Sequence, residues 1–261
     1  MRYGKQRYLL SFIFILKALL LGSLMSFIFS VTASAMTVVI DPGHGGYGTS
    51  HAGAIYMPYY EKELNFEVAS QVRDELSDAG IDVYMTREGD EPLSLEERAD
   101  LASDMGADLL ISIHFNSSAF HDKNGSEIWT SLYEPYGDEG RELGELILEE
   151  LGSLGFENKG VKVKSGDSGD YYGIIRHSVA HGIPAIIVEH CFIDSYIDRA
   201  ILDYVGTSAL AHADATGIIS YIESIGGITS QEHPAELSTA HSVEEVSPSV
   251  SHSVNQSRTL F

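Results

Sequence analysis

The chain contains a single cysteine, Cys191, among its 261 residues. An intramolecular disulfide is therefore excluded, and the fold must be stabilised by a packed core. Cys191 lies in an apolar segment, where a cysteine usually acts as a small hydrophobic side chain. We expect it to be a core residue and not a nucleophile.

Basic residues are scarce: 16 Lys and Arg stand against 38 Asp and Glu, which gives a formal net charge of −22. Binding to nucleic acid or to anionic surfaces needs a basic patch, and the sequence shows none. We therefore expect no nucleic-acid partner, and the excess acidic charge is most simply explained by solubility. The sequence also lacks internal repeats, so its length predicts one sizeable domain.

Long hydrophobic runs are missing except near the N-terminus. Three basic residues lie within the first seven, residues 18–31 are apolar, and Ala33-Ser34-Ala35 has the small-x-small form of a cleavage site. We predict that residues 1–35 form a signal peptide and that the protein is secreted or delivered to the cell envelope. A retained membrane anchor is the less favoured alternative, because it leaves the cleavage pattern unexplained.

Residues 36–228 are predicted to form the catalytic domain. Residues 229–261, rich in Ser, Glu and His with little periodicity, are predicted to be a disordered tail. Within the domain, hydrophobic periodicity alternates between strands and helices. The predicted strands cover 37–40, 81–85, 109–113, 125–131 and 184–188, and the predicted helices cover 60–80, 94–106, 138–154 and 203–225. This alternation favours an α/β fold, a three-layer α/β/α arrangement around a mostly parallel twisted sheet.

Three of the predicted strands lead to residues whose side chains can bind a metal or transfer a proton. His44 follows the first strand, and His114 and Glu189 close two continuous apolar runs of the kind found in buried parallel strands. Because sites of open α/β sheets lie at the carboxyl ends of the strands, these three side chains are expected to converge there.

Glu61, at the start of a predicted helix, completes a set that suits one Zn²⁺. Hydrolytic zinc sites commonly use two histidines and a carboxylate and leave one position for water. His44, Glu61 and His114 are the predicted ligands, and Glu189 is the predicted catalytic base.

Each of these residues also has a structural explanation when it is taken alone. A histidine at a strand end is usually hydrogen-bonded in the core, and Glu61 can stabilise a helix N-terminus. Glu189 resists such an explanation, because burying a carboxylate without a partner is costly. Asn65 and Asn116 are candidates for orienting ligands or substrate, with structural capping as an equal alternative.

Taken together, the motifs resemble those of zinc-dependent N-acetylmuramoyl-L-alanine amidases. They lie in that family's order over residues 37–221: Asp41-Pro-Gly-His44-Gly-Gly, Glu61-Lys-Glu-Leu-Asn65, Thr86-Arg87, Arg98, Ser112-Ile-His114-Phe-Asn116 and Val188-Glu189-His-Cys-Phe-Ile193. The resemblance implies zinc binding by the two histidines and Glu61, and catalysis by Glu189. The implied substrate is bacterial peptidoglycan, cut at the amide between the lactyl group of N-acetylmuramic acid and L-alanine.

Two other functions stay open on these residues: a zinc peptidase acting on peptidoglycan stem peptides, and a non-catalytic peptidoglycan-binding module. The presence of all four site residues favours an enzyme. The sequence departs from the family pattern at Cys191, where many relatives have glycine. It also has a short polar loop at 117–124, where some relatives insert a helix that plugs the site, so we expect no such self-inhibition. Recognisable wall-binding repeats are absent from the sequence.

Overall fold

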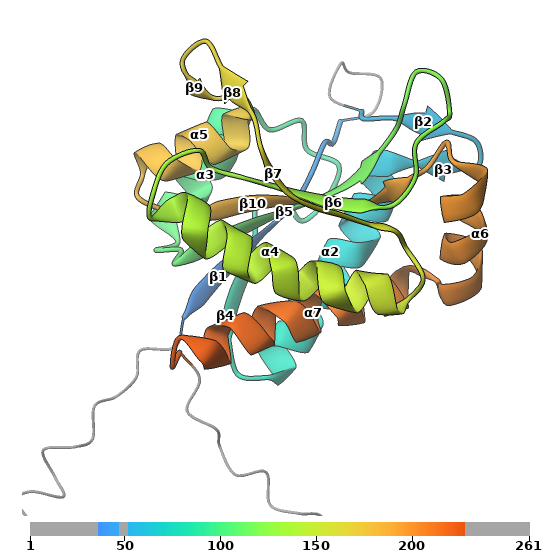
Figure 1. Ribbon diagram of the computed structural model, residues 1–261. Helices are drawn as coiled ribbons and strands as arrows, with labels where there is room; N and C mark the ends of the chain where they lie inside the picture. Colours follow the sequence, from blue (N-terminus) through green and yellow to red (C-terminus); the bar gives the residue numbers. More distant parts are fainter. Residues whose placement is uncertain (1–35, 47–51, 228–261) are drawn as a thin grey trace, which may run out of the picture. The chain divides into compact units, whose positions relative to one another are not determined.

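The computed structural model describes residues 36–46 and 52–227 (Figure 1). The predicted signal peptide and tail therefore lie outside the described residues. Within the described ranges, no helix is both long and apolar enough to cross a membrane. The strands are β1 (Thr37–Pro42), β2 (Ile55–Tyr56), β3 (Tyr59–Tyr60), β4 (Asp82–Met85), β5 (Leu109–Asn116), β6 (Ser126–Thr130), β7 (Asn158–Val163), β8 (Ser165–Gly166), β9 (Gly169–Asp170) and β10 (Ala185–Phe192). The helices are α2 (Glu61–Asp78), α3 (Leu95–Asp104), α4 (Tyr136–Ser153), α5 (Gly173–Ala180), α6 (Tyr196–Val205) and α7 (Thr207–Ser224).

A six-stranded sheet with the order β4-β1-β5-β10-β6-β7 forms the centre of the domain. The first four strands are parallel. β6 runs antiparallel to β10, and β7 runs parallel to β6. The prediction of a mostly parallel sheet is confirmed, and the three predicted strands that lead to the site, β1, β5 and β10, are adjacent.

Helices cover both faces of this sheet, which confirms the three-layer arrangement. α2, α4 and α7 pack on one face, and α3 packs with α5 on the other (Figure 1). The alternation along β1 explains the layers, since Val38 and Ile40 belong to the core cluster of the first face and Val39 to that of the second. Both faces of β1 are thus buried, which is why its sequence is continuously apolar.

One predicted helix is wrong in extent. The pattern over 203–225 predicted a single helix, but α6 ends at Val205 and α7 begins at Thr207. Gly206 separates them with φ 78°, a left-handed conformation that interrupts the helical hydrogen bonding. By contrast, the predicted capping box of α3 is present: Ser94 Oγ accepts the Glu97 N–H, and Glu97 Oε2 accepts the Ser94 N–H.

Candidate active site

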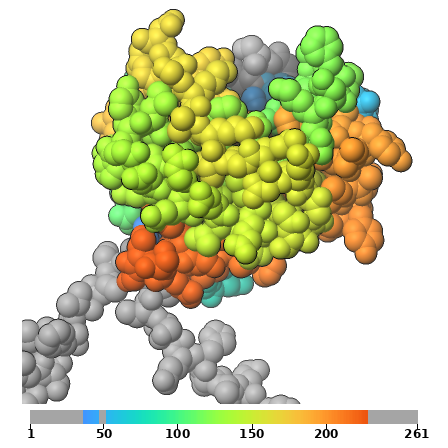
Figure 2. All heavy atoms as spheres, viewed as in Figure 1, coloured from blue at the N-terminus to red at the C-terminus, as the bar shows by residue number. Residues whose placement is uncertain are grey.

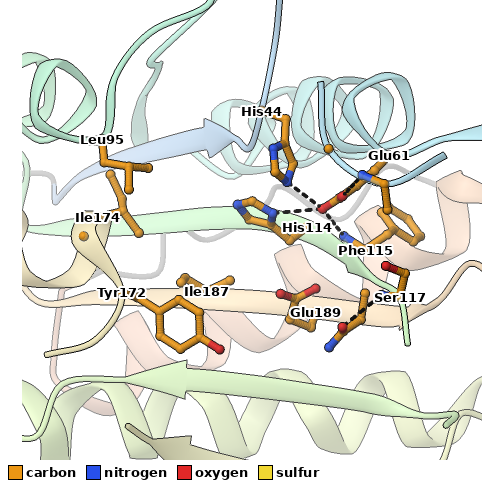
Figure 3. A pocket seen from close by; sticks show the side chains of 14 residues that line it. His44, Glu61, Leu95, His114, Phe115, Ser117, Tyr172, Ile174, Ile187 and Glu189 are labelled. Atoms are coloured by element: carbon orange, nitrogen blue, oxygen red, sulfur yellow. Dashed lines mark hydrogen bonds and ion pairs between the residues drawn. The ribbon is translucent and has the colours of Figure 1, made fainter. Parts of the chain in front are cut away.

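His44, Glu61 and His114 converge at the carboxyl edge of the sheet. His44 follows β1, Glu61 is the first residue of α2, and His114 lies near the end of β5. Glu61 Oε1 lies 3.0 Å from both His44 Nε2 and His114 Nδ1, as the dashed lines in Figure 3 mark. One ligand atom from each residue fits within 4.8 Å of the others. The structure therefore brings together the three side chains that the sequence proposed as metal ligands.

The turn that carries His44 depends on a close approach between backbone and ring. His44 itself has φ 64°, which is uncommon for a residue with a side chain. A Cβ added to the preceding Gly43 would lie 2.1 Å from His114 Nε2. Only glycine allows the turn to lie against this ring, so Gly43 fixes how near the two histidines come.

A buried ion pair stabilises the same turn. Arg98 of α3 donates to Asp41 Oδ1 at 2.7 Å, and both side chains are almost fully buried. Thr86 and Ser112 donate hydroxyl hydrogen bonds of 2.6 Å to the Asp41 carboxylate. Burial by itself raises the pKa of Asp41, but Arg98 and the hydroxyl donors outweigh it and the pKa is lowered. Asp41 is thus a charged anchor at the end of β1.

Two arginines and an amide bind the backbone carbonyls of the turn. Arg98 donates to His44 O at 2.6 Å and to Pro42 O at 3.0 Å. Arg87 also donates to Pro42 O, at 2.7 Å. Asn65 Nδ2 donates to Gly43 O at 3.0 Å. Asn65 is fully buried and does not line the pocket, so its contact is with the turn that carries a ligand and not with substrate.

Glu61 is ionised in this arrangement. Burial opposes its ionisation, but hydrogen bonds with His114 and His44 lower the pKa of Glu61 to about 2. Its second oxygen accepts the Ala54 N–H at 2.6 Å. The carboxylate is therefore held on one side by backbone and presents its other oxygen to the two imidazoles.

Glu189 lies opposite His114 in the register of β10 and β5. Among the described residues its Oε2 has no hydrogen-bond partner, although it is buried. Burial raises the pKa of Glu189 well above its usual value, and the nearby charges of Glu61 and Glu127 raise it further. A positive charge beside this carboxyl group would oppose that rise and favour its ionised form.

Glu127 faces Glu189 from the neighbouring strand β6. Asn116 Nδ2 donates to Glu127 Oε1 at 3.0 Å, and Lys162 of β7 pairs with Glu127 Oε2. Asn116 lines the pocket, as expected of a residue predicted to orient ligands or substrate, but its amide donates to Glu127. Glu127 and Lys162 were not predicted from the sequence. Only the pairing of β10 with β6 and of β6 with β7 shows that Glu127 lies beside Glu189 and that Lys162 lies beside Glu127.

The sequence also gave no role to His190, which secures the backbone of His114. His190 Nδ1 lies 3.0 Å from His114 O, and its Nε2 lies 2.8 Å from Asp214 Oδ2 in α7. Burial lowers the pKa of His190, but the Asp214 carboxylate outweighs burial and the pKa is raised. The His114 carbonyl and the Asp214 carboxylate can only accept, so both ring nitrogens are placed to donate, and His190 links α7 to the strand that carries His114.

These side chains open into a pocket of about 550 Å³. In Figure 3 His44, Glu61 and His114 lie on one side of it, with Glu189 and Tyr172 across from them. The apolar part of the wall is formed by Leu95, Ile174 and Ile187. A carbonyl compound that enters has room to reach both the candidate metal ligands and the Glu189 carboxyl group.

The donor set fits a zinc ion. Two imidazole nitrogens and one ionised carboxylate are the ligands of many hydrolytic zinc sites, and they leave a coordination position open. The buried Glu189 oxygen without a partner lies in the same pocket. A cation held here would offset the negative charge of Glu61 and favour ionisation of Glu189.

Comparisons with known proteins agree with this geometry. A family model described as N-acetylmuramoyl-L-alanine amidase matches residues 38–220. The chain is 32% identical over 188 residues to the N-acetylmuramoyl-L-alanine amidase LytC of Bacillus subtilis, covering 71% of this chain and 35% of that protein. It is 33% identical over 189 residues to YqiI of the same organism, covering 72% of this chain and 84% of YqiI.

A solved structure shows the same fold. The N-acetylmuramoyl-L-alanine amidase from Clostridium difficile 630 superposes with a TM-score of 0.63 at 30% identity, covering 73% of this chain and 98% of that one. The chain thus spans about a third of LytC but nearly the whole of this crystallised amidase. The chain belongs to the N-acetylmuramoyl-L-alanine amidase family.

Proposed function

We propose that this protein is a zinc-dependent hydrolase that cleaves the amide between the lactyl group of N-acetylmuramic acid and L-alanine in peptidoglycan. The observation that carries the proposal is the convergence of His44, Glu61 and His114 across the pocket from Glu189, whose Oε2 is buried without a hydrogen-bond partner among the described residues. Membership of the amidase family supports the choice of substrate.

In this proposal His44, Glu61 and His114 hold one zinc ion. When bound, zinc supplies a Lewis acid that polarises a carbonyl and promotes ionisation of water near neutral pH. The ionised Glu61 contributes the negative charge of the ligand set, and the Asp41–Arg98 pair holds the turn that positions His44. The protein thus prepares the ligand geometry before substrate enters.

Glu189 moves the proton. As a carboxylate it takes a proton from the attacking water, and as an acid it gives that proton to the alanine nitrogen when the carbon–nitrogen bond breaks. The products are a free lactyl carboxylate and a stem peptide with a free L-alanine amino group. Burial raises the pKa of Glu189 and so makes its carboxylate a stronger base for the water proton. The bound cation would keep that carboxylate ionised before the reaction begins.

The test is digestion of purified peptidoglycan by residues 36–261, loaded with zinc or treated with a chelator. Mass spectrometry should find intact sugar strands and stem peptides with free L-alanine termini, released only by the zinc-loaded protein. Glu189→Gln should lower the rate about 10²- to 10⁴-fold. Glu145→Gln, the same change on the exposed side of α4, should leave it unaltered.

Other products would overturn the assignment. Cuts within the stem peptide would identify a peptidase, and a folded, zinc-loaded protein that releases nothing would point to a binding module. Peptidoglycan lies outside the cytoplasm, so the substrate is consistent with the predicted signal peptide, which N-terminal sequencing of the exported protein would test.

A further inference from the structure

We propose that the surface beside Tyr172 binds the stem peptide of the substrate and recognises a free carboxylate on it. This surface, the aromatic shelf, consists of Trp129, Tyr171 and Tyr172 with Lys162 and Lys164. The inference rests on the proposed function, because it places one part of the proposed substrate next to the pocket that contains Glu189.

The rings of the shelf are continuous with the pocket. Tyr172 lines the pocket, and in Figure 3 its ring lies across from the two histidines with its hydroxyl on the side of Glu189. From there the shelf extends outward, since the Tyr172 ring centroid lies 5.1 Å from that of Trp129 and 5.2 Å from that of Tyr171. Tyr171 is about half exposed, so the outer end of the shelf is open to a ligand.

The shelf has a cation that no carboxylate neutralises. Lys164 Nζ lies 3.5 Å from the Tyr171 ring centroid and 5.8 Å from that of Tyr172, and it forms no ion pair within residues 36–46 and 52–227. Lys162, by contrast, lies over Trp129 but is paired with Glu127. In a chain with a net charge of −22, an exposed unpaired ammonium group on an aromatic surface is a distinctive anion-binding feature.

A second positive feature lines the pocket itself. α5 begins at Gly173, has no capping side chain at Tyr172 and has no acidic residue in its first turn. Tyr172, Gly173 and Ile174 all line the pocket. The unpaired N–H groups of this first turn carry partial positive charge, which favours a ligand anion on the same side as Lys164.

The chemistry of the substrate decides which part fits this surface. The lactyl carboxyl group of the sugar is already consumed in the scissile amide, so the sugar side presents no charge there. The stem peptide carries carboxylates, first on the D-glutamyl residue after L-alanine. We infer that the peptide runs from Glu189 over the Tyr172 ring toward Lys164, with its aliphatic groups against the rings.

The shelf is accessible from outside. Figure 2 shows the segment that contains β7 and the β8–β9 hairpin (yellow) on the surface of this face, with the hairpin projecting beyond α4. Lys164 connects these elements, and its side chain is exposed. A polymer can therefore reach Lys164 without opening the domain.

Trp129 is the only tryptophan in the chain, so its fluorescence reports binding at the shelf directly. We would titrate zinc-loaded Glu189→Gln, which retains its ligands but does not turn over, with two soluble compounds. These are N-acetylmuramoyl-L-alanyl-D-glutamate and the corresponding D-isoglutamine compound, in which an amide replaces one carboxylate. Binding is then measured separately from hydrolysis, so failure of the proposed reaction and failure of the shelf are distinguishable.

Adding Lys164→Met to this background should weaken binding of the D-glutamate compound about three- to fivefold, as expected for an exposed ion pair, and leave the D-isoglutamine compound unchanged. Lys123→Met, the same change on the exposed loop between β5 and β6, should alter neither. Equal weakening of both compounds, no effect on either, or no binding at all would overturn the inference.

Discussion

At the scale of single residues, Glu189 is a carboxyl group whose environment would change if the proposed metal bound. In the absence of metal, burial and the charges of Glu61 and Glu127 raise its pKa well above the ordinary 4.5. A folded-state pKa above the unfolded one means that the folded protein binds the additional proton. The free energy of unfolding then falls as the pH rises from the unfolded pKa toward the folded one.

This leads to a pH prediction for the metal-free protein. Glu189→Gln should unfold at a higher temperature than the wild type at pH 7 to 8, by on the order of a few degrees. Because the wild-type residue is protonated in both states only below its unfolded pKa, the difference should shrink toward pH 4.5 and disappear well below it. Calorimetry in the presence of a chelator measures it. A wild type more stable than the variant at pH 8 would contradict the assigned pKa shift.

The site residues were predictable to different degrees. His44, Glu61, His114 and Glu189 each lie next to a strong apolar pattern, so the sequence identified where they would be. Glu127 has no such signal, because a single acidic residue in a strand does not reveal what faces it across the sheet. Asn65 was predicted as part of the site, and the structure shows that it binds the carbonyl of Gly43.

At the scale of elements, the Arg98 side chain couples α3 to the turn that carries His44. Arg98 reaches from α3 to the Asp41 carboxylate and to the carbonyls of Pro42 and His44. The turn with His44 therefore depends on a helix that contributes no ligand. Removing one partner of such a buried pair leaves an uncompensated charge, which costs about 3–5 kcal/mol.

Arg98→Met should accordingly lower the free energy of unfolding by about 3–5 kcal/mol and weaken zinc binding, because Asp41 loses its counter-charge and His44 loses a carbonyl contact. Denaturant unfolding and a zinc titration measure the two effects. Arg141→Met on the exposed side of α4 provides the matched control and should change neither. Unchanged zinc affinity in a folded Arg98→Met would show that the pair only stabilises the domain.

The elements themselves were largely predictable. The capping box of α3 and the continuous apolar runs of β5 and β10 have strong local signals. The antiparallel direction of β6 has none, since direction is decided by the connections around the sheet. The break at Gly206 was missed because hydrophobic periodicity continues across it. α5 was missed because its 8 residues are too few for a distinctive periodicity.

At the scale of the whole molecule, zinc binding and stability should be linked. The proposed ligands come from a turn, a helix start and a strand that all belong to the folded domain, so on this proposal zinc should bind the folded state far better than the unfolded chain. A ligand with that preference stabilises the fold by mass action.

Zinc at a hundred times its dissociation constant should therefore add about 2.7 kcal/mol to the free energy of unfolding, or on the order of 5–10 °C in Tm for a domain of this size. Thermal unfolding with zinc and with a chelator measures the shift. Glu189→Gln should keep it, and His114→Ala should lose it. A similar rise in His114→Ala would place the bound zinc elsewhere.

The link between His190 and Asp214 makes the position of a predicted metal ligand depend on a helix far along the chain. Asp214 belongs to α7, the last helix within residues 52–227, yet its carboxylate secures the backbone of His114 through His190. A nascent or truncated chain that ends before α7 has every ligand and the base, but lacks the charge that fixes this strand. On the proposed function, the hydrolase would thus become competent only when α7 is in place.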